Sequence, residues 1–204
     1  MNIGSLTLIN NKNNYTILDN SDNSYYNFLI DSFTLPFKGN FYASNVCNLE
    51  QFIETNSFSI LTANKLLFSL YNQIHHLQQY NIAISFIDIT DILVIDGINF
   101  YFCNCDKLYP IVRNNITITD VYDKKNMFLS PEFKSNDKLP FITNSNSYIY
   151  SLALIVLYCM KQTNSKFIHC TNKEILDHYK STKLYSILSL ALINNPEKRT
   201  FVIF

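Results

Sequence analysis

The sequence has little glycine, no tryptophan and no net charge. Only 3 of its 204 residues are glycine. Loops that cradle phosphate groups depend on glycine because the backbone must approach the ligand closely, so the sequence argues against a glycine-rich nucleotide loop. Its 16 basic and 16 acidic residues cancel. This balance does not favour nucleic acid or an anionic membrane surface as a partner.

The sequence also lacks a long apolar run and a disulfide framework. The longest strongly apolar stretch, residues 148–160, is too short to span a bilayer and predicts a buried helix. Residues 1–5 have no basic start and no apolar core of signal-peptide length. The 5 cysteines are odd in number and lack both framework and zinc-finger spacing. We therefore expect reduced thiols, a cytoplasmic protein, and no metal or cofactor.

Hydrophobic residues are abundant. They make up 48% of the chain and charged residues 16%, which is typical of a globular protein with a sizeable core. Asn, Ile, Tyr, Phe and Lys are also abundant, and their codons are rich in A and T. This composition suggests an AT-rich genome, such as that of a large DNA virus.

Two hairpins are expected from turn signals. Residues 5–9 and 15–18 flank an Asn-rich turn, and short strands are expected over residues 1–46. Residues 92–95 and 98–102 read as two strands joined by Asp96-Gly97, a preferred two-residue hairpin turn. By contrast, residues 106–147 are predicted to form an irregular polar loop on the surface.

Several helices are expected after residue 47. Asn48, followed three residues later by Gln51, has the form of a capping box that opens a short helix through about residue 54. A second helix from about Thr62 has apolar residues at three-to-four-residue spacing. Further helices are expected at residues 148–160, 173–179 and 182–193.

Four short motifs occur in an order that is informative. They are Asp-Ile-Leu at residues 91–93, Ser-Pro-Glu at 130–132, Tyr-Ser-Leu-Ala at 150–153, and Asn-Pro-Glu-Lys-Arg at 195–199. Together with the order of elements, they resemble the helical lobe of the eukaryotic protein kinases. The resemblance implies an α+β fold with a reduced β-rich N-lobe over residues 1–46. A mostly helical C-lobe then covers residues 47–204 and carries the hairpin 91–103. An unrelated helical domain with a hairpin is the alternative.

The same resemblance predicts degenerate catalytic positions. It places Phe86 where kinases have the catalytic Asp, Asp91 where they have a metal-binding Asn, and Asn104 where they have the Asp of Asp-Phe-Gly. Phosphoryl transfer needs a positioning carboxylate and metal ligands, and phenylalanine supplies neither. We expect Asp88, Asp91 and Asp106 to be solvated loop acids.

The motifs contain both members of an ion pair that has a structural role in kinases. In kinases, the Glu of Ala-Pro-Glu forms a buried ion pair with a late Arg. The resemblance implies that Glu132 and Arg199 form this pair here. Loss of one member of a buried pair is costly, so its presence fits a retained scaffold without the chemistry.

The sequence therefore predicts a catalytically inactive kinase-like protein, a pseudokinase, that binds a protein partner as a regulator or scaffold. It resembles the truncated kinase-like inhibitors of some insect viruses. That likeness implies a host or viral kinase, or a translation-related factor, as partner, and neither nucleic acid nor membrane. Two alternatives stay open: an atypical active Ser/Thr kinase with migrated carboxylates, and a structural or virion component.

An apolar cluster near the junction of the two regions is the expected partner surface. Large apolar side chains in such number exceed what a short sheet easily buries, and an exposed patch typically binds protein. The other possibility is that these residues form the core between the lobes. The cluster consists of Phe33, Leu35, Phe37, Phe41 and Tyr42.

Overall fold

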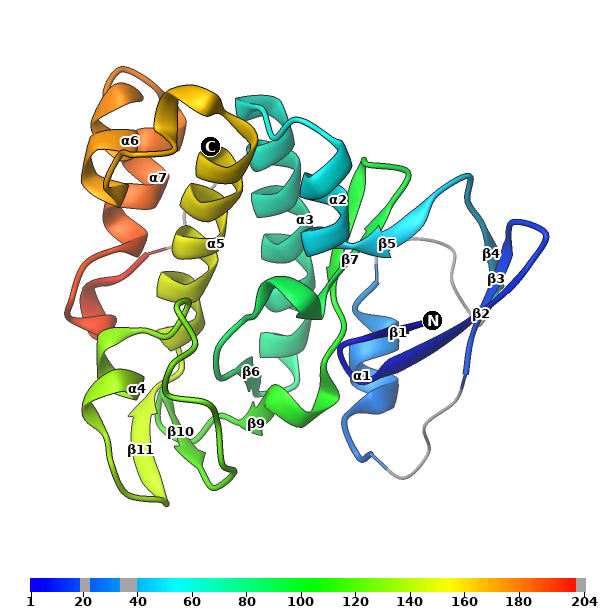
Figure 1. Ribbon diagram of the computed structural model, residues 1–204. Helices are drawn as coiled ribbons and strands as arrows, with labels where there is room; N and C mark the ends of the chain where they lie inside the picture. The colour runs from blue at the N-terminus through cyan, green and yellow to red at the C-terminus, as the bar shows by residue number, and fades with distance from the viewer. Residues whose placement is uncertain (19–22, 34–39, 201–204) are drawn as a thin grey trace.

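The computed structural model describes residues 1–18, 23–33 and 40–200 and has an α+β architecture (Figure 1). The helices are α1 (Tyr26–Asp31), α2 (Leu49–Thr55), α3 (Ile60–Gln79), α4 (Pro131–Ser135), α5 (Ser147–Thr163), α6 (Asn172–His178) and α7 (Lys183–Ala191). Four 3-10 turns are η1 (Ile89–Asp91), η2 (Cys105–Lys107), η3 (Ser165–Phe167) and η4 (Pro196–Lys198).

The strands form several small antiparallel sheets. One sheet has the order β1-β2-β3-β4 and a second the order β5-β7-β8, while β6 pairs with β9 and β10 pairs with β11. The strands are β1 (Asn2–Ile3), β2 (Leu6–Asn11), β3 (Asn14–Ile17), β4 (Asn40–Tyr42), β5 (Val46–Asn48), β6 (Ile82–Ile84), β7 (Ile92–Ile95), β8 (Asn99–Phe102), β9 (Leu108–Pro110), β10 (Asn115–Ile118) and β11 (Phe141–Asn144).

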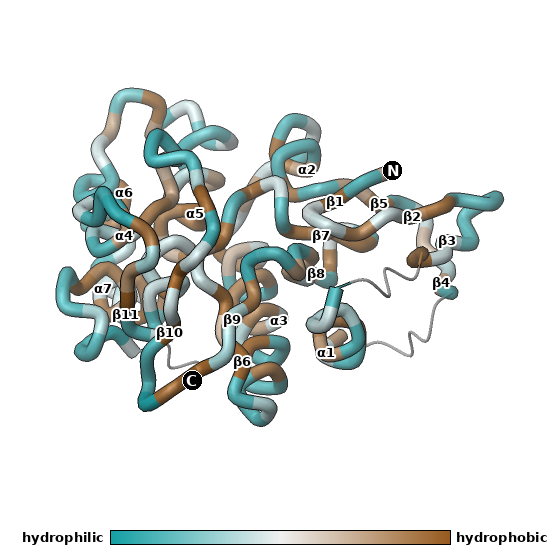
Figure 2. Tube along the Cα trace, turned by 90° about the horizontal axis from the view of Figure 1, so that it is seen from below, coloured by the Kyte–Doolittle hydropathy of each residue, from teal (hydrophilic) through white to brown (hydrophobic). Residues whose placement is uncertain are grey.

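The C-terminal helices and the N-terminal strands occupy opposite sides of the molecule. In Figure 1, α5, α6 and α7 lie on one side and β1–β4 on the other, with α3 and β7 between them. Figure 2 shows that the outer turns of α2 and the tip of the β2–β3 hairpin are hydrophilic. One cluster of buried apolar residues extends from Ile3 to Ala191 along the sequence. The two regions expected on either side of residue 46 therefore share a core.

Local signals account for most helix starts. Asn48 and Gln51 form the expected capping box at the start of α2, and Thr171 and Glu174 form another at α6. The helix expected at residues 148–160 is α5, which is buried on nearly every side. Few side chains of α5 meet water, so the helix packs against its neighbours on nearly every side and not through a single apolar face.

A buried glutamine joins α3 to the sheet. Gln73 is fully buried, and its amide nitrogen donates to the Phe102 carbonyl at 2.9 Å. Its amide oxygen accepts from the Phe102 N–H at 2.8 Å. One side chain thus satisfies both backbone groups of a residue on β8, which is the edge strand of the β5-β7-β8 sheet.

The central hairpin is present, with one residue more between its turn and its second strand than expected. Asp96 and Gly97 both have left-handed backbones, with φ of 52° and 65°. Ile95 pairs with Asn99, so Ile98 is an extra residue between the strands and is exposed. The Ile98 N–H donates to the Ile95 carbonyl at 3.1 Å, so the two-residue Asp96-Gly97 turn is confirmed. Only the strand pairing beyond the turn is shifted, because Ile98 forms a one-residue bulge.

Two further expectations were wrong. The stretch after residue 24, expected to be strand, contains the helix α1. The region 106–147, expected to be irregular, contains β9, β10, α4 and β11. Strands β10 and β11 pair across more than 20 residues of sequence, which a local pattern does not reveal.

Candidate functional site

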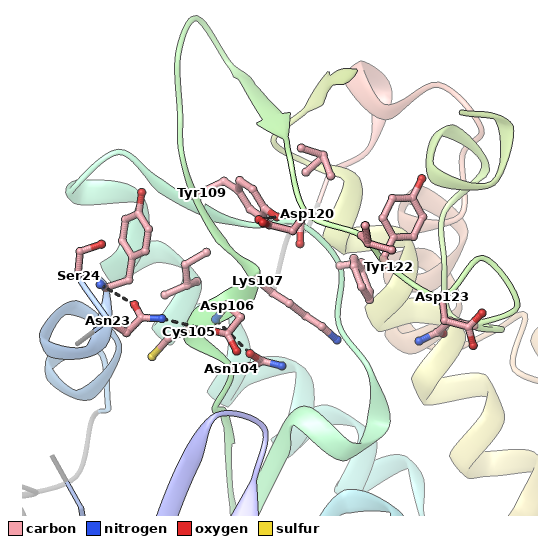
Figure 3. Close-up of a pocket in the computed structure, with 17 residues that line it drawn as sticks. Asn23, Ser24, Asn104, Cys105, Asp106, Lys107, Tyr109, Asp120, Tyr122 and Asp123 are labelled. Atoms are coloured by element: carbon pink, nitrogen blue, oxygen red, sulfur yellow. Dashed lines mark hydrogen bonds between the residues drawn. The ribbon is translucent and has the colours of Figure 1, made fainter. Parts of the chain in front are cut away.

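A cavity of about 700 Å³ lies where loops from several elements meet. Its lining comes from residues 23–25 before α1, residues 85–86 after β6, residues 104–109 around η2, and residues 118–126 after β10 (Figure 3). The volume is within the range of small-ligand pockets. Phe86 and Asn104, the positions that the resemblance predicts to be degenerate, belong to the lining, so this is the candidate site.

An ion pair joins the cavity lining to a buried carboxylate. Asp91 is only 3% exposed, and its Oδ2 accepts from the Lys107 ammonium at 2.5 Å. Its Oδ1 accepts from the Asn104 amide at 2.8 Å, and Oδ2 also accepts from the Asp88 N–H at 3.0 Å. Both carboxylate oxygens are therefore occupied by the protein's own donors. The expectation that Asp91 is a solvated loop acid is wrong, because partners 13 and 16 residues later bury and neutralise it.

Phe86 belongs to an aromatic cluster. Its ring lies 5.5 Å from that of Phe133 and 6.0 Å from that of Tyr122. The Lys107 ammonium sits 4.1 Å from the Phe86 ring centroid, which adds a cation–π contact to its ion pair. The position that the kinase resemblance assigns to a catalytic carboxylate thus holds a packed ring.

The other two acids of the sequence analysis have different surroundings. Asp106 is exposed, as expected, and accepts from the Asn23 amide at 3.1 Å. Asp88 is half-buried, accepts from the backbone and hydroxyl of Thr90, and also accepts from the Asn126 amide. Within the described ranges, no three His, Cys, Asp or Glu side chains gather closely enough to hold a metal ion.

The cavity also contains residues that the sequence analysis did not single out. Asp120 and Asp123 line it and are exposed, and Tyr109 and Tyr122 contribute aromatic walls. The Tyr109 hydroxyl donates to Asp120 Oδ2 at 2.6 Å. Burial, followed by this carboxylate, raises the pKa of Tyr109, so its hydroxyl keeps its proton. The polar loop 106–147 was the only sequence signal for these residues.

Glu132 and Arg199 meet as the resemblance implied. The guanidinium contacts both carboxylate oxygens, with Nη1 at 2.5 Å from Oε1 and Nη2 at 2.8 Å from Oε2. Arg199 also donates to the carbonyls of Ile193 and Asn194, and lies 4.9 Å from the Tyr150 ring centroid. The Arg199 side chain is fully buried and that of Glu132 is 15% exposed.

The pKa of Glu132 reflects this contact. Burial alone raises the pKa of a carboxyl group, but the hydrogen bonds and charge of Arg199 outweigh it here. The pKa of Glu132 therefore lies below its ordinary value. The pair links α4 to the segment that follows α7.

The expected apolar surface is divided. Phe33 and Phe41 are buried: Phe33 contacts the Tyr101 ring at 4.7 Å, and Phe41 stacks on Tyr15 at 5.3 Å. For these two residues the exposed-patch expectation is wrong, because partner rings cover them. Tyr42 is 82% exposed. Leu35 and Phe37 lie outside the described residues.

Comparisons with known proteins do not assign this chain to a family. No protein-family model matches the sequence, and the search of curated proteins found no similar chain. In the part of the chain that the structure describes, no helix combines the length and apolar character that a membrane crossing needs.

Proposed function

We propose that the protein is a pseudokinase, a catalytically inactive relative of the protein kinases, which regulates or scaffolds a partner protein by binding it. The kinase-like motifs of the sequence are the basis for the class. The five cysteines, all of them free thiols, support a reducing compartment such as the cytoplasm.

The state of Asp91 is the observation that carries the proposal. The resemblance puts a metal-binding residue at this position, yet both carboxylate oxygens accept from other groups of the chain. Mg²⁺ demands near-octahedral oxygen ligands and dehydrates reluctantly. To bind here it must displace the Lys107 ammonium from a buried carboxylate. The local arrangement favours a closed structural site over a metal site.

The pair of Glu132 and Arg199 supports the other half of the proposal. A bidentate, buried contact between these two motifs is what a kinase-like scaffold requires. A scaffold without its metal ligand is suited to binding and not to phosphoryl transfer.

The test is nucleotide binding and phosphate transfer by the purified protein. Anything that binds the native state alone raises its stability, so a nucleotide-binding protein melts at a higher temperature in excess Mg²⁺ and ATP. We expect no such rise and no transfer of labelled phosphate to the protein or to a generic substrate. The matched variant is Lys107→Met, which removes the cation from Asp91. A Mg²⁺-dependent rise in melting temperature in this variant alone supports closure of the site by Lys107.

The alternative enzyme class gives the opposite result. Asp106 lines the cavity, and the Asp88 carboxylate accepts from the amide of the lining residue Asn126. An atypical kinase with migrated carboxylates relies on this observation. Labelled-phosphate transfer by the wild type that disappears in Asp88→Asn or Asp106→Asn contradicts our proposal and supports that class.

A further inference from the structure

The cavity has negative charge that its own lining does not balance. Asp106, Asp120 and Asp123 all line it, and Lys107 is the cation among the lining residues. The Lys107 ammonium is already engaged by the buried Asp91 carboxylate at 2.5 Å. The Asp91 carboxylate thereby balances the charge of the lysine, and the carboxylates of Asp106, Asp120 and Asp123 are left without a balancing cation in the lining.

Each of these carboxylates keeps one oxygen for a ligand. Asp106 uses Oδ1 to accept from Asn23, and Asp120 uses Oδ2 to accept from Tyr109 and Thr119. Asp123 uses Oδ1 to accept from a backbone N–H. Within the described residues, their second oxygens have no hydrogen-bond partner and none of the three acids is in an ion pair.

Aromatic rings form the remaining walls. Tyr25, Tyr109 and Tyr122 line the cavity from three different segments of the chain. Phe86 lines it from a fourth segment, but the Lys107 ammonium already contacts its ring face. In Figure 3, Asp106, Tyr109, Asp120 and Tyr122 surround the space that the Lys107 side chain crosses. Carboxylates together with ring faces suit a flat cation, because a guanidinium stacks on aromatic faces and donates to carboxylates in a fixed fork.

We propose that this cavity receives an arginine side chain from a basic segment of the protein partner. This inference rests on the proposed binding function and names the chemistry of the partner. The negative lining opposes a phosphate-bearing ligand, since like charges repel across a low-dielectric wall. Arginine is favoured over lysine because it is more weakly hydrated and bidentate. Since the protein has zero net charge, long-range attraction of any polycation to the whole molecule is small.

The test uses a short fluorescein-labelled peptide of alternating glycine and arginine, with binding followed by anisotropy. Its matched peptide carries citrulline, which keeps the shape of arginine and removes the charge. At about 0.15 M salt, where charges beyond ~8 Å are screened, we expect the arginine peptide to bind at least about tenfold more tightly than the citrulline peptide. A lysine peptide is expected to bind between the two. Equal binding of the arginine and citrulline peptides overturns the proposal, and this comparison needs no variant.

Two pairs of substitutions then test whether the peptide binds in the cavity. Asp106→Asn with Asp120→Asn removes two charges and keeps the acceptors for Asn23 and Tyr109, so the fold is preserved. The control is Asp31→Asn with Glu54→Gln, two exposed acids outside the cavity lining. We expect the first pair to weaken arginine-peptide binding about tenfold and the control pair to change it less than about twofold. Equal weakening by both pairs shows non-specific charge attraction and overturns the assignment of the site.

Failure of this inference is distinguishable from failure of the proposed function. A protein that binds neither peptide and transfers no phosphate remains a pseudokinase candidate with another partner chemistry. Competition of ATP with the arginine peptide, together with transfer, overturns both proposals. Free arginine or a polyamine that displaces the peptide at equal concentration shows that the cavity takes a small cation, and this result overturns a protein partner as the source.

Discussion

At the scale of single residues, Arg199 has the most demanding environment. Its buried guanidinium makes four hydrogen bonds, of which two go to Glu132. Removing one partner of a buried pair leaves the other charge uncompensated. We expect Glu132→Gln or Arg199→Met to lower the free energy of unfolding by about 3–5 kcal/mol, measured by urea denaturation.

The matched control for this pair is on the surface. Lys124 and Asp137 also form an ion pair, but the Asp137 side chain is 87% exposed. We expect Asp137→Asn to leave the unfolding midpoint unchanged, because exposed pairs contribute little. If both pairs give the same effect, the burial argument for Arg199 is wrong.

The lowered pKa of Glu132 predicts a pH dependence. The pKa of Glu132 is lower in the folded state than in the unfolded state, where it is about 4.3. The stabilisation is therefore present above the unfolded pKa and is lost as the pH falls through the folded pKa. We expect the stability difference between wild type and Glu132→Gln to narrow below about pH 4. A difference that stays constant from neutral to acid pH contradicts this assignment.

Single residues also show where sequence reasoning reached its limit. The contact of Glu132 with Arg199 could be expected because each occupies a motif that resembles one in kinases. The burial of Asp91 could not, because it depends on Asn104 and Lys107 arriving from beyond the β7–β8 hairpin. A loop position alone favours solvent for a carboxylate, and only tertiary contact reverses that preference.

At the scale of elements, β4 shows how the alternation of side chains between the two faces of a strand gives neighbouring residues different surroundings. Phe41 is buried and stacked on Tyr15, whereas Tyr42 points to solvent. We expect Phe41→Ser to destabilise the protein by about 3–5 kcal/mol through the loss of buried ring area. Tyr42→Ser is its matched control, and we expect an unchanged melting temperature.

These two variants also test whether Tyr42, the exposed residue of the expected apolar surface, contacts a partner. If Tyr42→Ser weakens capture of a partner while the melting temperature stays constant, Tyr42 belongs to a binding surface. A large loss of stability in Tyr42→Ser is incompatible with its exposure.

Elements with strong local signals were predictable, and weakly marked ones were not. The capping box at Asn48 and the Asp96-Gly97 turn were found from sequence because each motif satisfies backbone groups locally. Helix α1 has six residues and no side-chain cap, so its sequence carries no start signal. In β10, Ile116 and Ile118 are buried on one face, yet the pairing with β11 depends on distant residues.

At the scale of the whole molecule, the N-terminal turn holds the first hairpin against the central one. Gly4 has a left-handed backbone with φ of 56°, and a Cβ there would lie 2.3 Å from the Cys103 carbonyl oxygen. Ser5 donates its N–H to the same carbonyl at 2.9 Å and accepts from the Cys105 N–H at 2.7 Å. Close approach of two backbones therefore joins the regions on either side of residue 46.

This contact predicts a large effect of Gly4→Ala. Gly97→Ala is the matched control, since Gly97 also has a left-handed backbone but its Cβ would meet only the Phe52 ring at 3.2 Å. Left-handed strain costs about 1–2 kcal/mol at either site. We expect Gly4→Ala to destabilise more than this, and to speed hydrogen exchange at Ser5 and Cys105. Equal effects of the two substitutions contradict the docking role of Gly4.

The amide of Gln73 has a consequence for how copies of the chain behave toward one another. An edge strand with an unpaired N–H and C=O is a template on which another chain can add a strand. Gln73 occupies both groups of Phe102 from within the same molecule. The helix thereby occupies the groups that an added strand would need at Phe102, and intermolecular pairing is blocked at this residue of β8. Resistance to strand addition at this end of β8 thus depends in part on a single side chain of α3.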